Sequence, residues 1–170
     1  MLLAIDIGNS NVVIGCLDEN NQTTALFRMV TDLKKTEDEY AAGMKTILEY
    51  SGMDLSTFEG AIICSVVPPL TEIFHMAVER IIGCNALVVG AGIKTGLNIQ
   101  VDNPSQVGSD RIVIAVAALA EYKPPLALMD LGTATTIEIV DENCTYIGGC
   151  ILPGVRVSLD ALTSRTSQLP

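Results

Sequence analysis

The chain has 170 residues, a hydrophobic content of 49% and a mean hydropathy of +0.42, so it can bury a sizeable core. Aromatic residues make up only 4% and tryptophan is absent, which favours an aliphatic core such as that of a sheet covered by helices. The net charge of −10 and the pI near 4.4 argue against nucleic acids and anionic membranes as partners.

The first half of the chain has the pattern of a mixed α/β fold. Apolar runs predict strands at residues 2–7, 12–17, 24–30, 60–67 and 86–89. Residues 18–21 have the composition of a hairpin turn. Thr36 and Glu39 match a capping box, which predicts a helix that ends near residues 51–52. Pro68-Pro69 ends the fourth strand, and a second helix is expected as far as Ile82.

A long polar segment, residues 90–108, separates this pattern from a third helix. Loops of that length are usually functional or disordered. Ser109 is expected to cap a helix over residues 110–121, which Lys123-Pro124-Pro125 breaks. We then expect strands at 126–130, 135–140 and 145–151, a hairpin turn at 141–143 and a helix at 155–164.

The order of these elements repeats, because the first half is βββαβαβα and the second begins βββα. We therefore expect two homologous lobes, residues 1–122 and 123–170, with a boundary near Lys123. By analogy with the first lobe, roughly 80 residues of the second repeat are absent. An incomplete lobe is expected to leave a sheet edge and an apolar face uncovered.

The cysteines indicate a reducing compartment. There are five, they are scattered, and none forms a CxxC pair. Most lie in apolar runs, so we expect most of them to be small buried side chains of a cytoplasmic protein rather than parts of a disulfide framework. The single histidine, His75, leaves too few ligands for a zinc site. Met1 leads into the first strand without a basic region, so no secretory leader is expected, and no apolar run approaches the ~18 residues of a membrane span.

Two segments far apart in the chain look like copies of one device. In each, an apolar strand leads into Asp-x-Gly with small polar residues: Asp6 and Gly8 in the first, Asp130 and Gly132 in the second. Glycine lets the backbone approach a ligand, successive N–H groups form a concave anion site, and the Asp can hold a cation beside phosphates. Two such turns facing each other would clamp a nucleotide polyphosphate, whereas a single one is usually an ordinary hairpin.

A βββαβαβα duplication with Asp-x-Gly turns resembles the superfamily of acetate kinase, sugar kinases, Hsp70 and actin. Five segments, in natural order and spacing, narrow the resemblance to the type III pantothenate kinases and together span essentially the whole chain. They are residues 6–10, Thr31-Asp32 with 36–40, 103–111, 130–136 and 148–154. The resemblance implies duplicated actin-like, ribonuclease H-like lobes of the α/β class, the second of them incomplete.

The resemblance also implies an activity. Members of this family phosphorylate pantothenate with ATP to 4'-phosphopantothenate, the first step of coenzyme A synthesis. They need a divalent metal such as Mg²⁺ and a monovalent cation, K⁺ or NH₄⁺, and they work as homodimers. Because the second lobe is incomplete, we expect the 170-residue chain by itself to have little kinase activity.

In the family's pattern, the first turn is the phosphate motif for ATP. Its residues here are Asp6, Ile7, Gly8, Asn9, Ser10, Asn11, Val12 and Val13. Gly8 would open the loop, Asn9 and Ser10 would donate hydrogen bonds, and Asp6 would face the divalent metal through water. Asp130 corresponds to the ligand of the monovalent cation and Thr133 to an ATP contact. The alternative for both turns is a hairpin whose polar residues bond locally.

The segment before and within the third helix corresponds to the substrate site. Its residues are Val101, Gly108, Ser109, Asp110 and Arg111. Asp110 matches the catalytic base, which would orient the substrate hydroxyl and accept its proton, and a helix N-terminus stabilises a carboxylate. Arg111 offers a planar fork to the carboxylate of pantothenate. The plainer alternative is that Asp110 only complements the helix dipole and that Arg111 is its surface partner.

Two positions in this segment depart from the family's pattern. The family usually has alanine where Ser109 stands, and it commonly has tyrosine where Val101 stands. Valine cannot donate a hydrogen bond to a substrate.

Other interpretations stay open. Gly148-Gly149 and Pro153-Gly154 match a glycine-rich segment near the ATP cleft, or they mark a bulge and a helix start. The chain could be a non-catalytic relative, such as an accessory factor in transcription, although its intact Asp6, Asp110 and Asp130 argue against this. It could also be another small-molecule kinase of the superfamily, which the segment 103–111 argues against.

Overall fold

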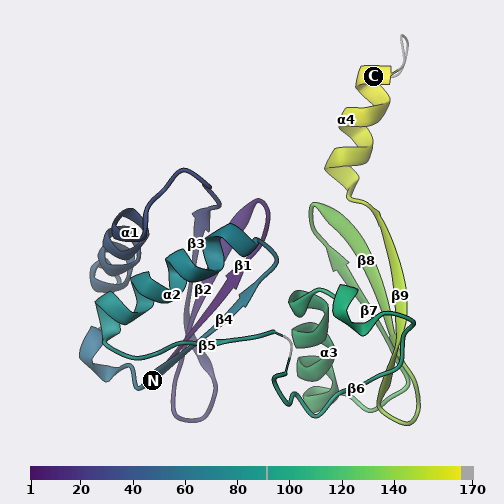
Figure 1. The fold of residues 1–170 in the computed structure, drawn as a ribbon, viewed down its shortest axis with the longest axis horizontal. Coiled ribbons are helices and arrows are strands. Elements are labelled where there is room, and N and C mark those ends of the chain that lie inside the picture. Colours follow the sequence, from purple (N-terminus) through teal and green to yellow (C-terminus); the bar gives the residue numbers. More distant parts are fainter. Residues whose placement is uncertain (91, 166–170) are drawn as a thin grey trace. The chain divides into compact units, whose positions relative to one another are not determined.

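The structure, a computed structural model, describes residues 1–90 and 92–165. The chain forms two compact units, Met1–Ile93 (unit 1) and Lys94–Pro170 (unit 2), each with its own sheet and hydrophobic cluster. The order βββα of unit 1 recurs at the end of unit 2 (Figure 1). This confirms the expected α/β class with a repeated start.

Unit 1 is built on a five-stranded sheet with the order β3-β2-β1-β4-β5. Its strands are β1 (Leu2–Ile7), β2 (Asn11–Leu17), β3 (Thr23–Val30), β4 (Gly60–Ser65) and β5 (Leu87–Val88). Its helices are α1 (Glu37–Tyr50) and α2 (Pro68–Ile82), with a 3-10 turn, η1 (Leu55–Thr57). The first three strands are antiparallel neighbours, whereas β4 runs parallel to β1.

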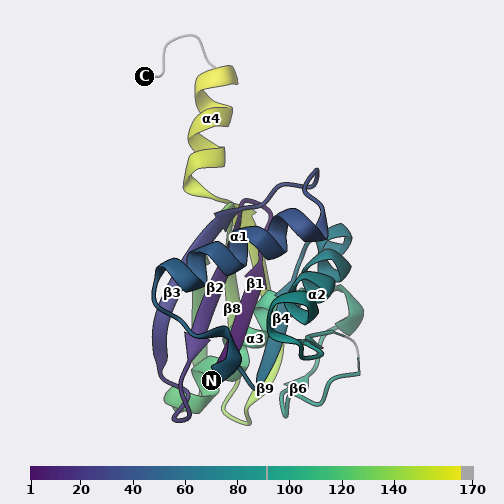
Figure 2. The same cartoon turned by 90° about the vertical axis from the view of Figure 1, so that its left-hand side faces the viewer.

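Period-two alternation places the core of unit 1 on one face of the sheet. Leu3, Ile5 and Ile7 of β1 are buried, while Leu2 and Asp6 are exposed. Both helices lie in front of these strands in Figure 2, and they contribute the buried side chains Tyr40, Met44, Leu48, Leu70, Phe74 and Val78. The capping box predicted at Thr36 and Glu39 opens α1 and is confirmed.

Unit 2 has a four-stranded sheet with the order β6-β9-β8-β7. Its elements are β6 (Asn98–Ile99), the 3-10 turn η2 (Pro104–Gln106), α3 (Ser109–Glu121), β7 (Leu126–Leu131), β8 (Ala134–Val140), β9 (Thr145–Pro153) and α4 (Val155–Arg165). Its core is small: Ala115 of α3 packs with Val140 and Tyr146, and Leu126 and Leu128 of β7 join them. The helix α4 continues beyond the end of β9 and buries none of its side chains (Figure 1).

Three expectations from the sequence were wrong in detail. The segment 90–108 is not all loop, because β6 pairs with β9 over Asn98 and Ile99. The N-cap of α3 is Gly108 rather than Ser109, and Gly108 makes no side-chain cap bond. The strand β4 ends at Ser65, before Val66 and Val67, because the backbone already turns there into α2.

The compact units divide elsewhere than the lobes expected from the repeat. The units meet between Ile93 and Lys94, whereas the repeat places its boundary near Lys123. The segment between these points belongs to unit 2 by its contacts, because β6 pairs with β9 and α3 packs on β7 and β8. The repeat boundary describes the order of elements and stays a prediction.

The hairpin turns after β2 and β8 have the same geometry. Asp18 Oδ1 accepts the amides of Asn20 and Gln22 at 2.8 Å, and Asp141 Oδ1 accepts those of Asn143 and Thr145 at 2.9 and 2.8 Å. The residue before the last donor has a left-handed backbone in both turns, with φ of 59°. A shared side-chain bond pattern of this kind supports a structural duplication of the two hairpins.

Candidate functional site

The Asp6 turn joins β1 to β2 in unit 1. Asp6 is exposed at the end of β1 and pairs in register with Val13. The Gly8 amide donates to the Asn11 carbonyl at 3.0 Å, which closes the turn, and a Cβ at Gly8 would lie 3.1 Å from the same oxygen. The close approach explains why glycine stands here.

The tip of this turn is exposed and is supported by Thr31, the residue that follows β3. Asn9, Ser10 and Asn11 are exposed, whereas the side chains of Ile7 and Val12 are fully buried in the core. The Thr31 hydroxyl donates to the Gly8 carbonyl at 2.6 Å, and the Thr31 amide donates to the Ser10 carbonyl at 3.2 Å. Of the residues expected to contact ATP, Ile7 and Val12 could therefore do so only through the main chain.

The Asp130 turn in unit 2 repeats this arrangement. The Gly132 amide donates to the Ala134 carbonyl at 3.0 Å, and Asp130 and Thr133 are exposed. The Gly154 amide donates to the Thr133 carbonyl at 3.0 Å, as the Thr31 amide does to Ser10 in unit 1. A Cβ at Gly154 would overlap the Gly132 carbonyl, so this packing requires glycine.

The second turn is one residue shorter than the first. Asp6 pairs with Val13, seven residues on, whereas Asp130 pairs with Thr136, six residues on. In both turns a strand ends at an Asp-x-Gly sequence. The shared feature is therefore an exposed polar tip that backbone hydrogen bonds hold in place. The two turns are therefore similar in structure as well as in sequence.

The residues expected to bind substrate all lie in unit 2. Gly108, Ser109, Asp110 and Arg111 form the start of α3 and are partly buried. Asp110 Oδ1 accepts the Arg111 amide at 2.8 Å, which uses one of its oxygens within the first helical turn. Val101 packs against the cluster around Tyr146, and its Cγ1 lies 3.5 Å from the Cβ position of Gly148.

The guanidinium of Arg111 forms a two-pronged ion pair with Glu138 of β8. Its Nε donates to Oε1 at 2.5 Å and its Nη2 to Oε2 at 2.7 Å. The Tyr146 hydroxyl of β9 donates to the same Oε2 atom, and the Tyr146 ring centroid lies 6.0 Å from the Arg111 Cζ. Glu138 is 2% exposed and the Arg111 side chain 15%, so this is an internal ion pair.

The charges of this cluster are mutually dependent. Burial by itself would raise the pKa of Glu138, but the hydrogen bonds from Arg111 and Tyr146, together with the guanidinium charge, outweigh it and lower that pKa. The hydrogen bond to Glu138 raises the pKa of Arg111. Burial, followed by the hydrogen bond to Glu138, raises the pKa of the Tyr146 phenol. At neutral pH the cluster therefore holds a carboxylate, a guanidinium and a neutral phenol.

The glycine pair of β9 makes room for this carboxylate. A register shift between Ile139 and Val140 forms a bulge at which Gly148 has φ of 109°. A Cβ at Gly149 would overlap the Ile137 carbonyl and would lie 2.8 Å from Glu138 Oε2. The bulge expected at Gly148-Gly149 is thus confirmed, whereas a place for this segment near the cleft stays a prediction.

The sequence analysis did not single out Glu138 and Tyr146. Along β8 the structure buries Glu138 and Val140, which share the face that α3 covers, and leaves Ile137 and Ile139 only partly buried. The available signal was an isolated glutamate in an apolar strand opposite a glycine pair. Its meaning depended on which face α3 covers.

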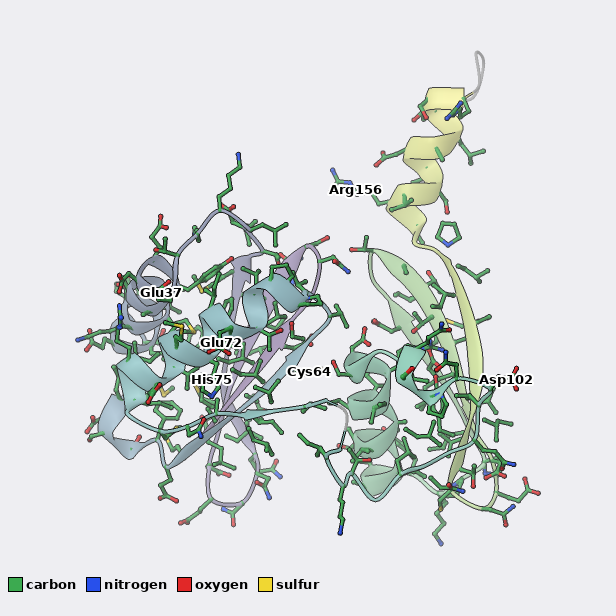
Figure 3. The ribbon with its side chains drawn as sticks, viewed as in Figure 1. Glu37, Cys64, Glu72, His75, Asp102 and Arg156 are labelled. Carbon is green, nitrogen blue, oxygen red and sulfur yellow. The ribbon has the colours of Figure 1, made fainter. Side chains whose placement is uncertain are left out.

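The described residues do not form a metal cage of protein ligands. In residues 1–90 and 92–165, no three His, Cys, Asp or Glu side chains gather in a group. His75 on α2 instead makes a 2.6 Å hydrogen bond to Asn85, and Asp102 is exposed (Figure 3). Mg²⁺ usually binds through one or two carboxylates plus substrate phosphates, and the exposed Asp6 beside a glycine turn fits that chemistry. None of the helices in the described part of the chain is long and apolar enough to span a membrane.

Comparison with known proteins identifies relatives along the whole chain. The family model described as type III pantothenate kinase matches residues 2–170. Proteins named type III pantothenate kinase from Brevibacillus brevis, Bacillus cytotoxicus and an Exiguobacterium species are 48%, 45% and 44% identical over 100% of this chain. The chain spans 66%, 64% and 66% of those relatives, just under two thirds of their length.

Solved structures with low sequence identity share the fold. A putative 2-dehydro-3-deoxygalactonokinase from Sinorhizobium meliloti has a TM-score of 0.55 at 11% identity, covering 99% of this chain and 58% of that one. The ethanolamine utilization protein EutJ from Carboxydothermus hydrogenoformans has a TM-score of 0.53 at 14% identity, covering 95% of this chain and 56% of that one. These matches support the expected fold class.

Proposed function

Because the chain belongs to the type III pantothenate kinase family, we propose that it takes part in the ATP-dependent phosphorylation of pantothenate, the first step of coenzyme A synthesis. The observation that carries the proposal is the family match over residues 2–170, including Asp110 and Arg111 at the start of α3. The relatives' name supplies the substrate, and the reaction class follows from it.

Asp110 acts in this proposal as the general base. Its carboxylate orients the primary hydroxyl of pantothenate and accepts its proton while the hydroxyl oxygen bonds to the γ-phosphorus of ATP. The bond between that phosphorus and the β,γ-bridging oxygen breaks, and ADP leaves. Asp110 Oδ1 is already fixed by the Arg111 amide, which leaves Oδ2 for the hydroxyl proton.

The polar turns supply the phosphate contacts. In unit 1, the exposed Asn9 and Ser10 are the candidate donors to phosphate oxygens of ATP. In unit 2, the exposed Thr133 is a candidate ATP contact. Asp6 would hold the divalent metal, and Asp130 would contribute to a monovalent-cation site for K⁺ or NH₄⁺. When bound, these ions would supply positive charge beside the phosphates.

Arg111 binds the carboxylate of pantothenate in this proposal. Its Nε–H and one Nη2–H are engaged by Glu138, so only its other N–H groups can meet the substrate. Gly108 and Ser109 lie beside them in the first turn of α3. Val101 provides an apolar contact rather than the hydrogen bond of a tyrosine. A homodimer in the cytoplasm completes the proposal.

The test is phosphorylation of pantothenate by the purified chain, with Mg²⁺, ATP and K⁺ or NH₄⁺ present. Detection of 4'-phosphopantothenate by mass spectrometry allows even slow turnover to be measured. We expect ATP-dependent 4'-phosphopantothenate, its loss in Asp110→Asn, and its persistence in Asp160→Asn, which makes the same change on the exposed face of α4. Absence of both turnover and pantothenate binding by the unmutated chain would sink the proposal.

A further inference from the structure

Glu138 is a buried carboxylate with every oxygen occupied. It is 2% exposed at the middle of β8, and its two oxygens accept three hydrogen bonds, from Arg111 Nε, Arg111 Nη2 and the Tyr146 hydroxyl. A buried ion pair is weak evidence for stability, because apolar side chains of similar volume often serve as well. Stability by itself therefore does not account for the pair, whose direct effect is to hold the Arg111 side chain.

The sheet is built to admit this carboxylate. On the neighbouring strand β9, Gly149 lies opposite Glu138 in register, and a Cβ there would lie 2.8 Å from Oε2. The bulge beside it brings Tyr146 to the same oxygen. The strand β9 thus provides both the space beside the Glu138 carboxylate and the hydroxyl that binds it. That carboxylate in turn binds Arg111 of α3.

The ion pair fixes the edge of the Arg111 guanidinium that carries Nε and Nη2. Glu138 does not bind the N–H groups on the other edges. The Nε–H and one Nη2–H are held by Glu138, so the group cannot rotate about its long axis without breaking both bonds. The N–H groups of Nη1 and the second N–H of Nη2 point along the remaining edges of the planar group. An arginine held in this way is pre-organised for a second anion, so less conformational entropy is lost on binding.

We propose that Glu138 is a positioning residue, which orients Arg111 for the carboxylate of the substrate and ties the first turn of α3 to β8. The proposal rests on the proposed function for the identity of that anion. Arg111 directly follows Asp110, whose Oδ1 accepts the Arg111 amide, so the same ion pair also restrains the candidate base. Glu138 touches neither reactant and acts through Arg111.

The experiment compares Glu138→Gln with Glu142→Gln in the whole chain. Both variants remove one carboxylate from unit 2, but Glu142 is exposed in the turn between β8 and β9. Steady-state kinetics with pantothenate, and with the alcohol analogue that lacks its carboxylate, report whether recognition of the anion changes. A two-dimensional ¹H–¹⁵N spectrum of the arginine Nε–H groups reports the orientation of Arg111 without any turnover.

We expect Glu138→Gln to raise the KM for pantothenate by roughly tenfold, the lower end of the effect of losing one hydrogen bond between charged groups. The KM for ATP should stay within about twofold, and the preference for pantothenate over the alcohol should fall by the same factor as the KM rises. In the spectrum, a downfield, slowly exchanging Arg111 Nε–H signal should disappear. Glu142→Gln should leave all of these values unchanged.

Two results would overturn the positioning role. One is a Glu138→Gln variant that keeps the parent preference for the carboxylate, even if its melting temperature falls, because this marks a purely structural residue. The other is an Arg111 Nε–H signal that exchanges freely in the parent chain. If the parent chain neither phosphorylates nor binds pantothenate, the proposed function fails and substrate positioning fails with it, whereas loss of the signal in Glu138→Gln would still establish the restraint on Arg111.

Discussion

Replacement of Arg111 by methionine should destabilise unit 2 strongly at neutral pH. The substitution leaves the Glu138 carboxylate, 2% exposed, without its cationic partner and with only the neutral hydroxyls of Tyr146 and Thr136 to stabilise its charge. Removal of one member of a buried pair typically costs 3–5 kcal/mol, and the 15% exposure of Arg111 places the expectation at about 3 kcal/mol. That free energy corresponds to roughly 150-fold more frequent opening of the surrounding structure.

The cost should depend on pH in a defined direction. In the parent chain the pKa of Glu138 is lowered on folding, so its contribution is present above its unfolded pKa of about 4.3 and is lost as the pH falls through the folded value. Without Arg111, burial raises the pKa of Glu138 in the folded chain. The free energy of unfolding of the variant is therefore reduced most at high pH, where Glu138 must be buried as an anion. The difference between the two chains should therefore shrink as the pH is lowered from 7 towards 4.5.

Amide hydrogen exchange is the suitable assay, because protection factors can be read separately for each unit. Peptides from β8 and α3 should lose protection in Arg111→Met, while those from β1 and β2 should not. Lys45→Met removes the exposed Lys45–Glu49 pair, whose atoms are 3.7 Å apart, and should cost at most about 0.5 kcal/mol. A loss below about 1 kcal/mol for Arg111→Met, or one equal at pH 7 and 5, would refute the reasoning.

Two further substitutions test the backbone features of each unit. Gly149→Ala places a Cβ onto the Ile137 carbonyl and should destabilise unit 2 by about 3 kcal/mol. Gly15→Ala is the control, because its Cβ meets nothing closer than 3.8 Å, and it should cost about 1 kcal/mol or less. Equal changes in amide exchange in the two variants would contradict this expectation. Thr36→Ala removes the hydroxyl that accepts a hydrogen bond from the Glu39 amide, and it should destabilise α1 by about 1 kcal/mol. The loss should appear as faster amide exchange in the first turn of α1. Unchanged exchange there would show that the capping box does not stabilise the helix.

Much of the candidate site could be predicted from the sequence because its signals are local. The Asp-x-Gly turns at Asp6 and Asp130 combine apolar flanks with glycine, and both lie at strand ends as predicted. The roles of these aspartates and of Asp110 stay predictions, since they concern bound groups. Glu138 was missed because a glutamate between two isoleucines gives no local sign of which face is buried.

The sequence by itself determined where most strands and helices lie, because alternation, capping residues and turn chemistry act over a few neighbouring residues. Only the tertiary structure decided pairings between distant segments. It joined Asn98–Ile99 to β9, and it placed α3 over the face of β8 that carries Glu138. These outcomes depend on long-range backbone pairing and on the burial of a charge against its partner, and neither is encoded in the periodicity of a single segment.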